Sequence, residues 1–90
     1  MDDLDKYLTE QKKDPEFAEI WEADQLEYKV TCMLIAARNE QDMSQTELAR
    51  KSGIRQSNIS RIEQGVAVPS LRTLSRLAYG LGKKLQISFV

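Results

Sequence analysis

A row of polar side chains between residues 56 and 64 is the part of this sequence best suited to contact another molecule. On a helix of about 100° per residue, Ile59 and Ile62 fall on one side. The opposite side carries Gln56, Ser57, Ser60, Arg61 and Gln64. Amide, hydroxyl and guanidinium groups in such a row can hydrogen-bond to the edges of DNA bases. The pattern therefore predicts a helix with an apolar inner face and an outer face that can bind DNA.

Two kinds of DNA contact are expected from these residue types. Arg61 and Gln56 are the strongest candidates for base edges, because arginine pairs bidentately with guanine and glutamine with adenine. Ser57 is a weaker candidate of the same kind. Polar groups at helix starts and flanks suit phosphate contacts, and here they are Gln45, Arg55, Asn58 and Ser70. The alternative is a solvated polar surface, which is also how we interpret Arg72 and Arg76.

A helix–turn–helix is predicted to position this row. Ser44 is a good N-cap, and Glu47 three residues later completes a capping box, so the first helix starts at Ser44. Leu48 and Ala49 face inward, and Gly53 supplies the turn before the polar helix.

The sequence after this unit predicts a loop, a helix and a strand. Residues 66–69 form the loop, and Ser70 caps a helix that Gly80 and Gly82 end. Its inward stripe is Leu71, Leu74, Leu77, Ala78 and Leu81. Residues 84–89 alternate polar and apolar, which is typical of a half-buried strand. A single strand has unpaired edges, so it favours a dimer or pairing with the sheet of a bound protein.

One long helix from about Pro15 to Asn39 is expected before the helix–turn–helix, with Asp14 as its N-cap. Its core-facing stripe is Leu26, Val30, Met33, Leu34 and Ala37. A second apolar set, made of Phe17, Ile20, Trp21, Tyr28 and Ile35, falls roughly 160° away and predicts a partner surface. The alternative is a break near Asp24 that lets the first segment fold back.

Length and charge indicate one small domain with an acidic leader. Residues 1–24 hold nine acids and three lysines, whereas residues 25–90 hold ten bases and five acids. The overall pI near 5.4 therefore conceals a basic domain. We divide the chain into an acidic, partner-binding N-terminal extension (1–24), a DNA-binding domain (25–82) and a C-terminal strand or tail (83–90).

Several classes of function find no support in the composition. Cys32 is the single cysteine and there is no histidine, so an internal disulfide and a cysteine-based zinc site are excluded. We interpret Cys32 as a partly buried structural thiol. We expect no metal, no cofactor and no catalysis. The acidic start is not a secretory signal and the longest apolar run is too short to span a membrane, so a cytoplasmic protein is expected.

The motifs resemble a known family. Ser44-Gln45-x-x-Leu48-Ala49, Gly53-Ile54, Ile59-Ser60-Arg61-Ile62-Glu63-x-Gly65 and Pro69-Ser70-Leu71-x-Thr73-Leu74 are similar to the helix-turn-helix domains of Cro and phage repressors, the XRE family. The match covers about Leu34 to Leu81. Two segments outside this match make the resemblance more specific. They are similar to the HigA type of antitoxin from bacterial toxin–antitoxin operons, and they are Asp14-Pro15-Glu16-Phe17 and Leu81-Gly82-Lys83-Lys84-Leu85-x-Ile87.

This resemblance implies an all-α, lambda-repressor-like helix-turn-helix bundle with an N-terminal helical extension and a short C-terminal strand. It implies base and phosphate contacts at the DNA-binding positions named above. It also implies an internal ion pair between Arg38 and Glu63, where related repressors join their first and third helices; the alternative is two unrelated surface charges.

The implied partners are a palindromic double-stranded DNA operator, a second copy of the chain and a HigB-like toxin, an mRNA-cleaving enzyme of the RelE fold. A toxin that handles RNA would be basic, which suits an acidic, aromatic leader. The candidate toxin-binding residues are Phe17, Ile20, Trp21 and Tyr28, with Glu16, Glu19, Glu22 and Asp24 around them. The chief alternative is a stand-alone Cro-type repressor of a phage or mobile element. A third possibility is an RNA-binding helix-turn-helix factor.

Overall fold

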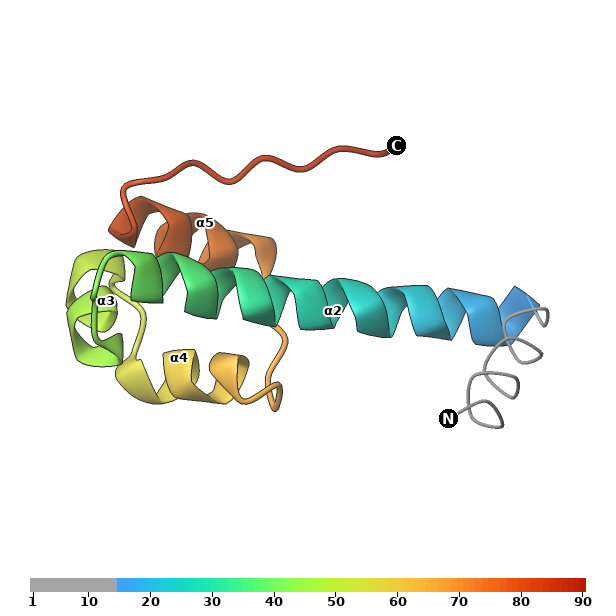
Figure 1. Ribbon diagram of the computed structural model, residues 1–90, viewed down its shortest axis with the longest axis horizontal. Helices are drawn as coiled ribbons and strands as arrows, with labels where there is room; N and C mark the ends of the chain where they lie inside the picture. Colours follow the sequence, from blue (N-terminus) through green and yellow to red (C-terminus); the bar gives the residue numbers. More distant parts are fainter. Residues whose placement is uncertain (1–14) are drawn as a thin grey trace.

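The computed structural model describes residues 15–90, and this range contains four helices and no strand. They are α2 (Pro15–Glu40), α3 (Gln45–Ser52), α4 (Gln56–Glu63) and α5 (Leu71–Gly80), labelled as in Figure 1. Side chains are described from residue 18 onward. The all-α fold class is confirmed.

The three short helices gather around the second half of α2 (Figure 1). Helix α3 packs against α4 and α5, and α2 packs against α4. Apolar side chains from all four helices and the connections between them meet in one core, which consists of Leu34, Met43, Leu48, Ile54, Ile59, Ile62, Leu77 and Leu81. Ile59 and Ile62 are completely buried, or nearly so, and hold α4 down on its apolar side.

Local hydrogen bonds fix where the short helices start and stop. The Ser44 hydroxyl accepts the backbone N–H of Glu47 at 3.0 Å, and the Ser70 hydroxyl accepts that of Thr73 at 3.1 Å. Each bond satisfies one of the free donors in the first turn of a helix. Gly53 ends α3 with a φ of +75°, a left-handed conformation that costs glycine nothing. These expected boundaries are confirmed.

Helix α2 is continuous through Asp24, so the alternative of a break there is wrong. Its 26 residues make a helix about 39 Å long, at a rise of 1.5 Å per residue. From Glu19 to Lys29 every side chain except Trp21 is exposed. Figure 1 shows the reason: the first half of α2 projects beyond the other helices.

The predicted core stripe of α2 is only partly buried. Leu34 is buried and Ala37 packs against the core, but Leu26 and Met33 are 63% and 52% exposed. Leu26 stays exposed because it borders an open groove toward the α4–α5 connection and the start of α5, and no described side chain fills that groove. A helical wheel shows which residues share a side but not how far along the helix a neighbour extends. Cys32 is also exposed, contrary to expectation.

Gly80 ends α5 as predicted, and it has a second role that the sequence did not show. It is the last residue of α5 and is buried, and a Cβ built there would lie 3.0 Å from the Ser52 Cβ and 3.1 Å from the Leu48 Cδ1. Such separations are shorter than ordinary van der Waals contact. Gly80 therefore lets α5 approach α3 closely, while Gly82, with φ +72°, makes the turn after the helix.

The strand predicted for residues 84–89 does not form in the described part of the chain. Residues 83–90, called the tail from here on, run over α5 toward the first half of α2 without regular structure (Figure 1). The alternating pattern is present, but a strand needs a second strand to accept and donate its backbone hydrogen bonds. None lies beside the tail within residues 15–90.

Candidate functional site

The outer face of α4 presents the polar row to solvent. Arg55, Gln56, Ser57, Arg61 and Gln64 are exposed, and Asn58 and Ser60 are half-buried at its flank. The Gln64 amide donates to the Ser60 hydroxyl at 3.2 Å, so these two side chains are held together. Ser70 is exposed at the start of α5, and Gln45 is half-buried at the start of α3. The predicted DNA-binding residues thus lie on α4, directly before it at Arg55, and at the starts of α3 and α5.

The charges around this face suit a polyanion. Residues 48–90 contain eight lysines and arginines and a single acid, Glu63. Glu63 does not oppose a nearby phosphate, because it pairs with Arg38 of α2: the guanidinium Nε donates to Oε2 and Nη2 donates to Oε1, both at 2.8 Å. On α4 and the connection that leads into it from α3, the exposed charged side chains are therefore Arg55 and Arg61.

The Arg38–Glu63 ion pair also fixes the internal geometry of the domain. The Arg38 and Glu63 side chains are 15% and 7% exposed. A third nitrogen of the guanidinium donates to the Met43 carbonyl at 2.9 Å, which ties the end of α2 to the connection before α3. The hydrogen bond to Glu63 raises the pKa of Arg38, so the arginine stays charged at any ordinary pH.

Glu63 continues a chain of hydrogen bonds to the exposed start of α4. The Gln45 amide donates to Glu63 Oε1 at 3.2 Å, and the Gln56 amide donates to Gln45 Oε1 at 2.8 Å. Gln56 is therefore held in place before any ligand arrives, with Gln45 as the bridge. Sequence reasoning missed these contacts, because no residue spacing shows that Gln45 and Gln56 of different helices lie side by side.

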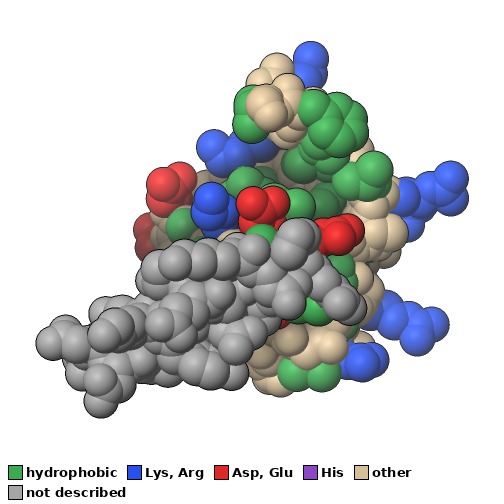
Figure 2. Space-filling model, turned by 90° about the vertical axis from the view of Figure 1, so that its right-hand side faces the viewer, with side chains coloured by type: hydrophobic (Ala, Val, Ile, Leu, Met, Phe, Trp, Pro, Cys, Tyr) green, Lys and Arg blue, Asp and Glu red, His purple; other side chains and the backbone are tan. Residues whose placement is uncertain are grey.

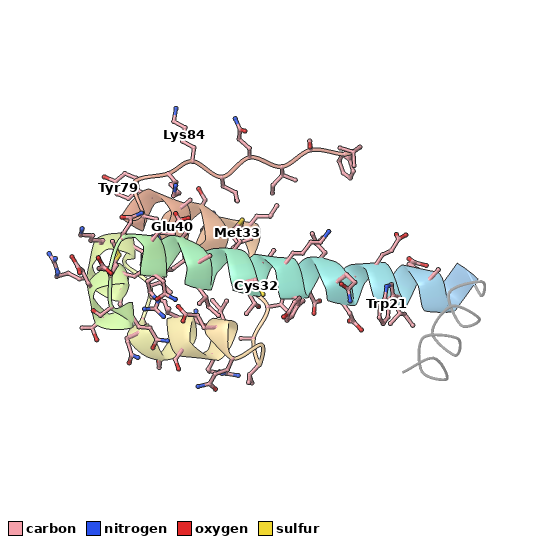
Figure 3. The ribbon with its side chains drawn as sticks, viewed as in Figure 1. Trp21, Cys32, Met33, Glu40, Tyr79 and Lys84 are labelled. Atoms are coloured by element: carbon pink, nitrogen blue, oxygen red, sulfur yellow. The ribbon has the colours of Figure 1, made fainter. Side chains whose placement is uncertain are left out.

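The candidate toxin-binding residues lie on the projecting half of α2, and their side chains from residue 18 onward are described. Ile20 and Tyr28 are 54% and 67% exposed, and Trp21 is half-buried. The acids Glu19, Glu22 and Asp24 are exposed. The side chains of Glu16 and Phe17 lie outside the described residues, as does everything predicted for residues 1–14. Figure 3 shows Trp21 on the half of α2 that no other helix covers.

Two further features of α2 bear on this surface. A hydrogen bond to Cys32, one turn away, raises the pKa of the exposed Tyr28 above its usual value. Carboxylates, apolar side chains and a basic side chain lie close together at this end of the molecule, and further lysines and arginines stand at its edges (Figure 2). Among residues 15–90, no cluster of three or more potential ligands could hold a metal, and no helix has the length and apolar character to cross a membrane.

Comparison with known proteins gives one family and several relatives. The family model described as helix-turn-helix matches residues 34–87. Antitoxin HigA1 of Mycobacterium tuberculosis is 34% identical over 87 residues, which cover 96% of this chain and 58% of that protein. This chain thus spans little more than half the length of that relative.

Two other relatives match a shorter part of the chain. An uncharacterised HTH-type transcriptional regulator of Haemophilus influenzae is 44% identical over 54 residues, covering 60% of this chain and 55% of that protein. The ImmF control region 10 kDa protein of Bacillus phage phi105 is 34% identical over 59 residues, covering 66% of each. No solved structure matched at a significant level.

Proposed function

Because the chain belongs to the helix-turn-helix family, we propose that it binds a specific DNA operator through the outer face of α4 and neutralises a toxin through the projecting half of α2. The observation that carries the DNA-binding half is the polar row itself. It is exposed, it is free of unpaired acids, and Gln56 in it is positioned by Gln45. A side chain that a neighbouring residue already holds in place loses little conformational freedom when it contacts a DNA base.

In this proposal Gln56, Ser57 and Arg61 contact bases, supported by Ser60 and Gln64. The phosphate contacts come from Gln45, Arg55, Asn58 and Ser70. One such helix covers only a few base pairs, so we propose a homodimer that places two of them about 34 Å apart on a palindrome. A dimer that binds the operator of its own operon would repress its own synthesis.

The antitoxin half rests on the likeness to Antitoxin HigA1 and on the surface of α2. A helix that projects into solvent with exposed Ile20 and Tyr28 has an apolar surface that the described domain does not cover. The acids around it suit a basic partner, and a HigB-like, RelE-fold toxin that cleaves mRNA would be basic. The partner surface and the DNA surface are on different helices, so one chain can serve both.

The experiment has two arms. The first measures binding of the purified protein to a randomised pool of DNA duplexes and to single-stranded RNA of the same length. The second co-expresses the chain with the small protein encoded in the neighbouring reading frame and measures co-purification and rescue of growth. Selection of one duplex sequence with capture of the neighbour supports both halves. Retention of RNA with no duplex preference would instead support an RNA-binding factor.

A stand-alone repressor is the second candidate, and the likeness to the phage phi105 control-region protein favours it. In that case the projecting half of α2 serves oligomerisation alone. The two candidates differ in the second arm: the stand-alone repressor selects an operator but captures no protein encoded beside it.

A further inference from the structure

A groove between α2 and the connection from α4 to α5 borders the proposed operator contacts only at Gln64, and it shares Asp24 and Tyr28 with the proposed toxin surface. It encloses about 490 Å³, a volume in the range of sites that bind small molecules or several side chains. Its walls are mainly apolar and include Leu26, Val30, Ala67, Val68, Leu71 and Leu74. Leu26, Val68 and Leu71 are each more than 60% exposed, so the groove offers apolar surface to an incoming chain.

The charges lining the groove are all negative within the described residues. Asp24 and Glu27 stand at its α2 side, and no lysine or arginine lines it. Glu63 also reaches the groove, but its charge is already paired with Arg38. The segment that fits must therefore be apolar with one or two positive charges next to the apolar part.

The tail of this same chain has that composition. Lys83 and Lys84 precede an alternating stretch in which Leu85, Ile87 and Phe89 fall on one side of an extended backbone. Leu85 is half-buried and lines a small hollow with Met33 and Leu77 of its own chain. Ile87 is 63% exposed and Phe89 is fully exposed. The apolar side of the tail is thus covered at its start and uncovered where it passes beyond the domain.

A chain does not cover its own groove with its own tail in this structure. The tail runs over α5 on the side of α2 away from α4, whereas the connection from α4 to α5 begins beside α4 and passes behind α2 to reach α5 (Figure 1). Figure 3 shows the Lys84 side chain pointing away from the helices into solvent, where a second molecule can meet it.

We propose that the groove receives the tail of a second copy of the chain, with Ile87 and Phe89 against Leu26, Val68 and Leu71, and Lys83 and Lys84 near Asp24 and Glu27. In a two-fold dimer the exchange is reciprocal, so each contact is made twice. The inference rests on the proposed homodimer, and it adds the surface that the dimer uses.

A disulfide test between two differently labelled chains examines the contact directly. Both chains carry Cys32→Ser; one also carries Val68→Cys and the other Phe89→Cys. Each chain then has one thiol, so a heterodimer bond can form only between molecules, and only if the two Cα atoms come within about 7 Å. The matched control replaces Val68→Cys with Ser57→Cys, which is also exposed but lies on α4.

We expect the 68–89 pair to cross-link under mild oxidation at least about tenfold faster than the 57–89 pair. Sedimentation of the same proteins gives the oligomeric state. A dimer whose 68–89 pair is no faster than the control overturns the groove assignment and leaves the homodimer standing. A protein that is monomeric at micromolar concentration, both alone and on its operator, overturns the homodimer and the inference together.

A charge exchange gives a second, independent readout. Glu27→Lys and Lys84→Glu should each raise the dissociation constant of the dimer by roughly twofold to fivefold, the range of an exposed ion pair, and the double variant should recover most of the loss. If the double variant does not recover affinity, the placement of Lys83 and Lys84 near Asp24 and Glu27 is wrong. If Val68→Asp abolishes capture of the neighbouring protein while the dimer is unchanged, the groove belongs to that partner and the inference is wrong.

Discussion

Arg61 and Gln56 should determine which operator the protein selects. Both are exposed on the outer face of α4, and each can pair bidentately with one base. We expect Arg61→Ala and Gln56→Ala each to weaken operator binding by roughly 1–3 kcal/mol and to relax the preference at one base pair. Gel shifts on a randomised operator pool measure both effects.

The controls for this prediction are two other arginines. Arg55→Ala should weaken binding to all sequences alike, because a phosphate contact carries no sequence information. Arg72→Ala, an exposed arginine on α5, should change neither affinity nor preference. Unchanged selectivity for both Arg61→Ala and Gln56→Ala would show that these two residues do not determine which bases the protein selects.

Arg38 should contribute far more to stability than a typical charged surface residue. Arg38→Ala leaves the Glu63 carboxylate, which is 7% exposed, with Gln45 as its remaining donor. Removing one partner of a buried pair costs about 3–5 kcal/mol. The matched control is Lys51→Ala, which breaks the Glu47–Lys51 pair at 3.5 Å, where both side chains are more than 40% exposed; such pairs contribute about 0–1 kcal/mol.

Urea unfolding followed by circular dichroism distinguishes the two variants. If Arg38→Ala shifts the unfolding free energy no more than Lys51→Ala does, the ion pair does not fix the domain geometry. Operator binding by Arg38→Ala at a temperature where it is still folded adds a second readout, because Glu63 also holds Gln45, which holds Gln56.

At the scale of the elements, the contact between α3 and α5 depends on the missing side chain of Gly80. The Cβ of an alanine there would lie 3.0 Å from the Ser52 Cβ and 3.1 Å from the Ser52 backbone nitrogen, which cannot move without shifting α3. We expect Gly80→Ala to destabilise the fold by about 1–3 kcal/mol, as other overpacked cores are. This holds although alanine favours a helix by up to about 1 kcal/mol over glycine.

The control for Gly80→Ala lies on the same helix. Ser75→Ala is exposed and should stay within about 0.5 kcal/mol of the parent protein. Equal unfolding midpoints for the two variants would show that α3 and α5 separate without cost, contrary to the close approach described here.

The elements themselves could be predicted because their signals are local. Ser44 and Ser70 cap the helices that they precede, and Gly53 makes its turn, since each acts on residues within one helical turn. What depends on distant neighbours could not be predicted in the same way. The exposure of Leu26, the close approach at Gly80 and the bridge from Gln45 to Gln56 all depend on where another helix ends or lies. The tail shows the same limit, because its alternating pattern indicates a strand but not the partner that a strand requires.

For the whole molecule, charge and shape separate the two proposed functions. The exposed acids Glu19, Glu22 and Asp24 lie on the projecting half of α2, whereas Arg55 and Arg61 lie on or just before α4. Carboxylates would repel DNA phosphates and attract a basic protein, so each surface excludes the ligand of the other. A change on one surface should therefore leave the other function intact.

Trp21 tests this separation. It is half-buried on the projecting half of α2, next to the exposed Ile20, and large aromatic side chains carry much of the energy of protein interfaces. We expect Trp21→Ala to cost about 2 kcal/mol or more in affinity for the toxin while operator binding by the free protein hardly changes. The matched control is Tyr79→Ala, an exposed aromatic on α5, which should alter neither. Co-purification with the protein encoded in the neighbouring reading frame, alongside operator gel shifts, measures both affinities. Removal of residues 1–24 should abolish capture because it removes Trp21 together with Glu19, Glu22 and Asp24; full neutralisation by that truncated chain would place the toxin surface elsewhere.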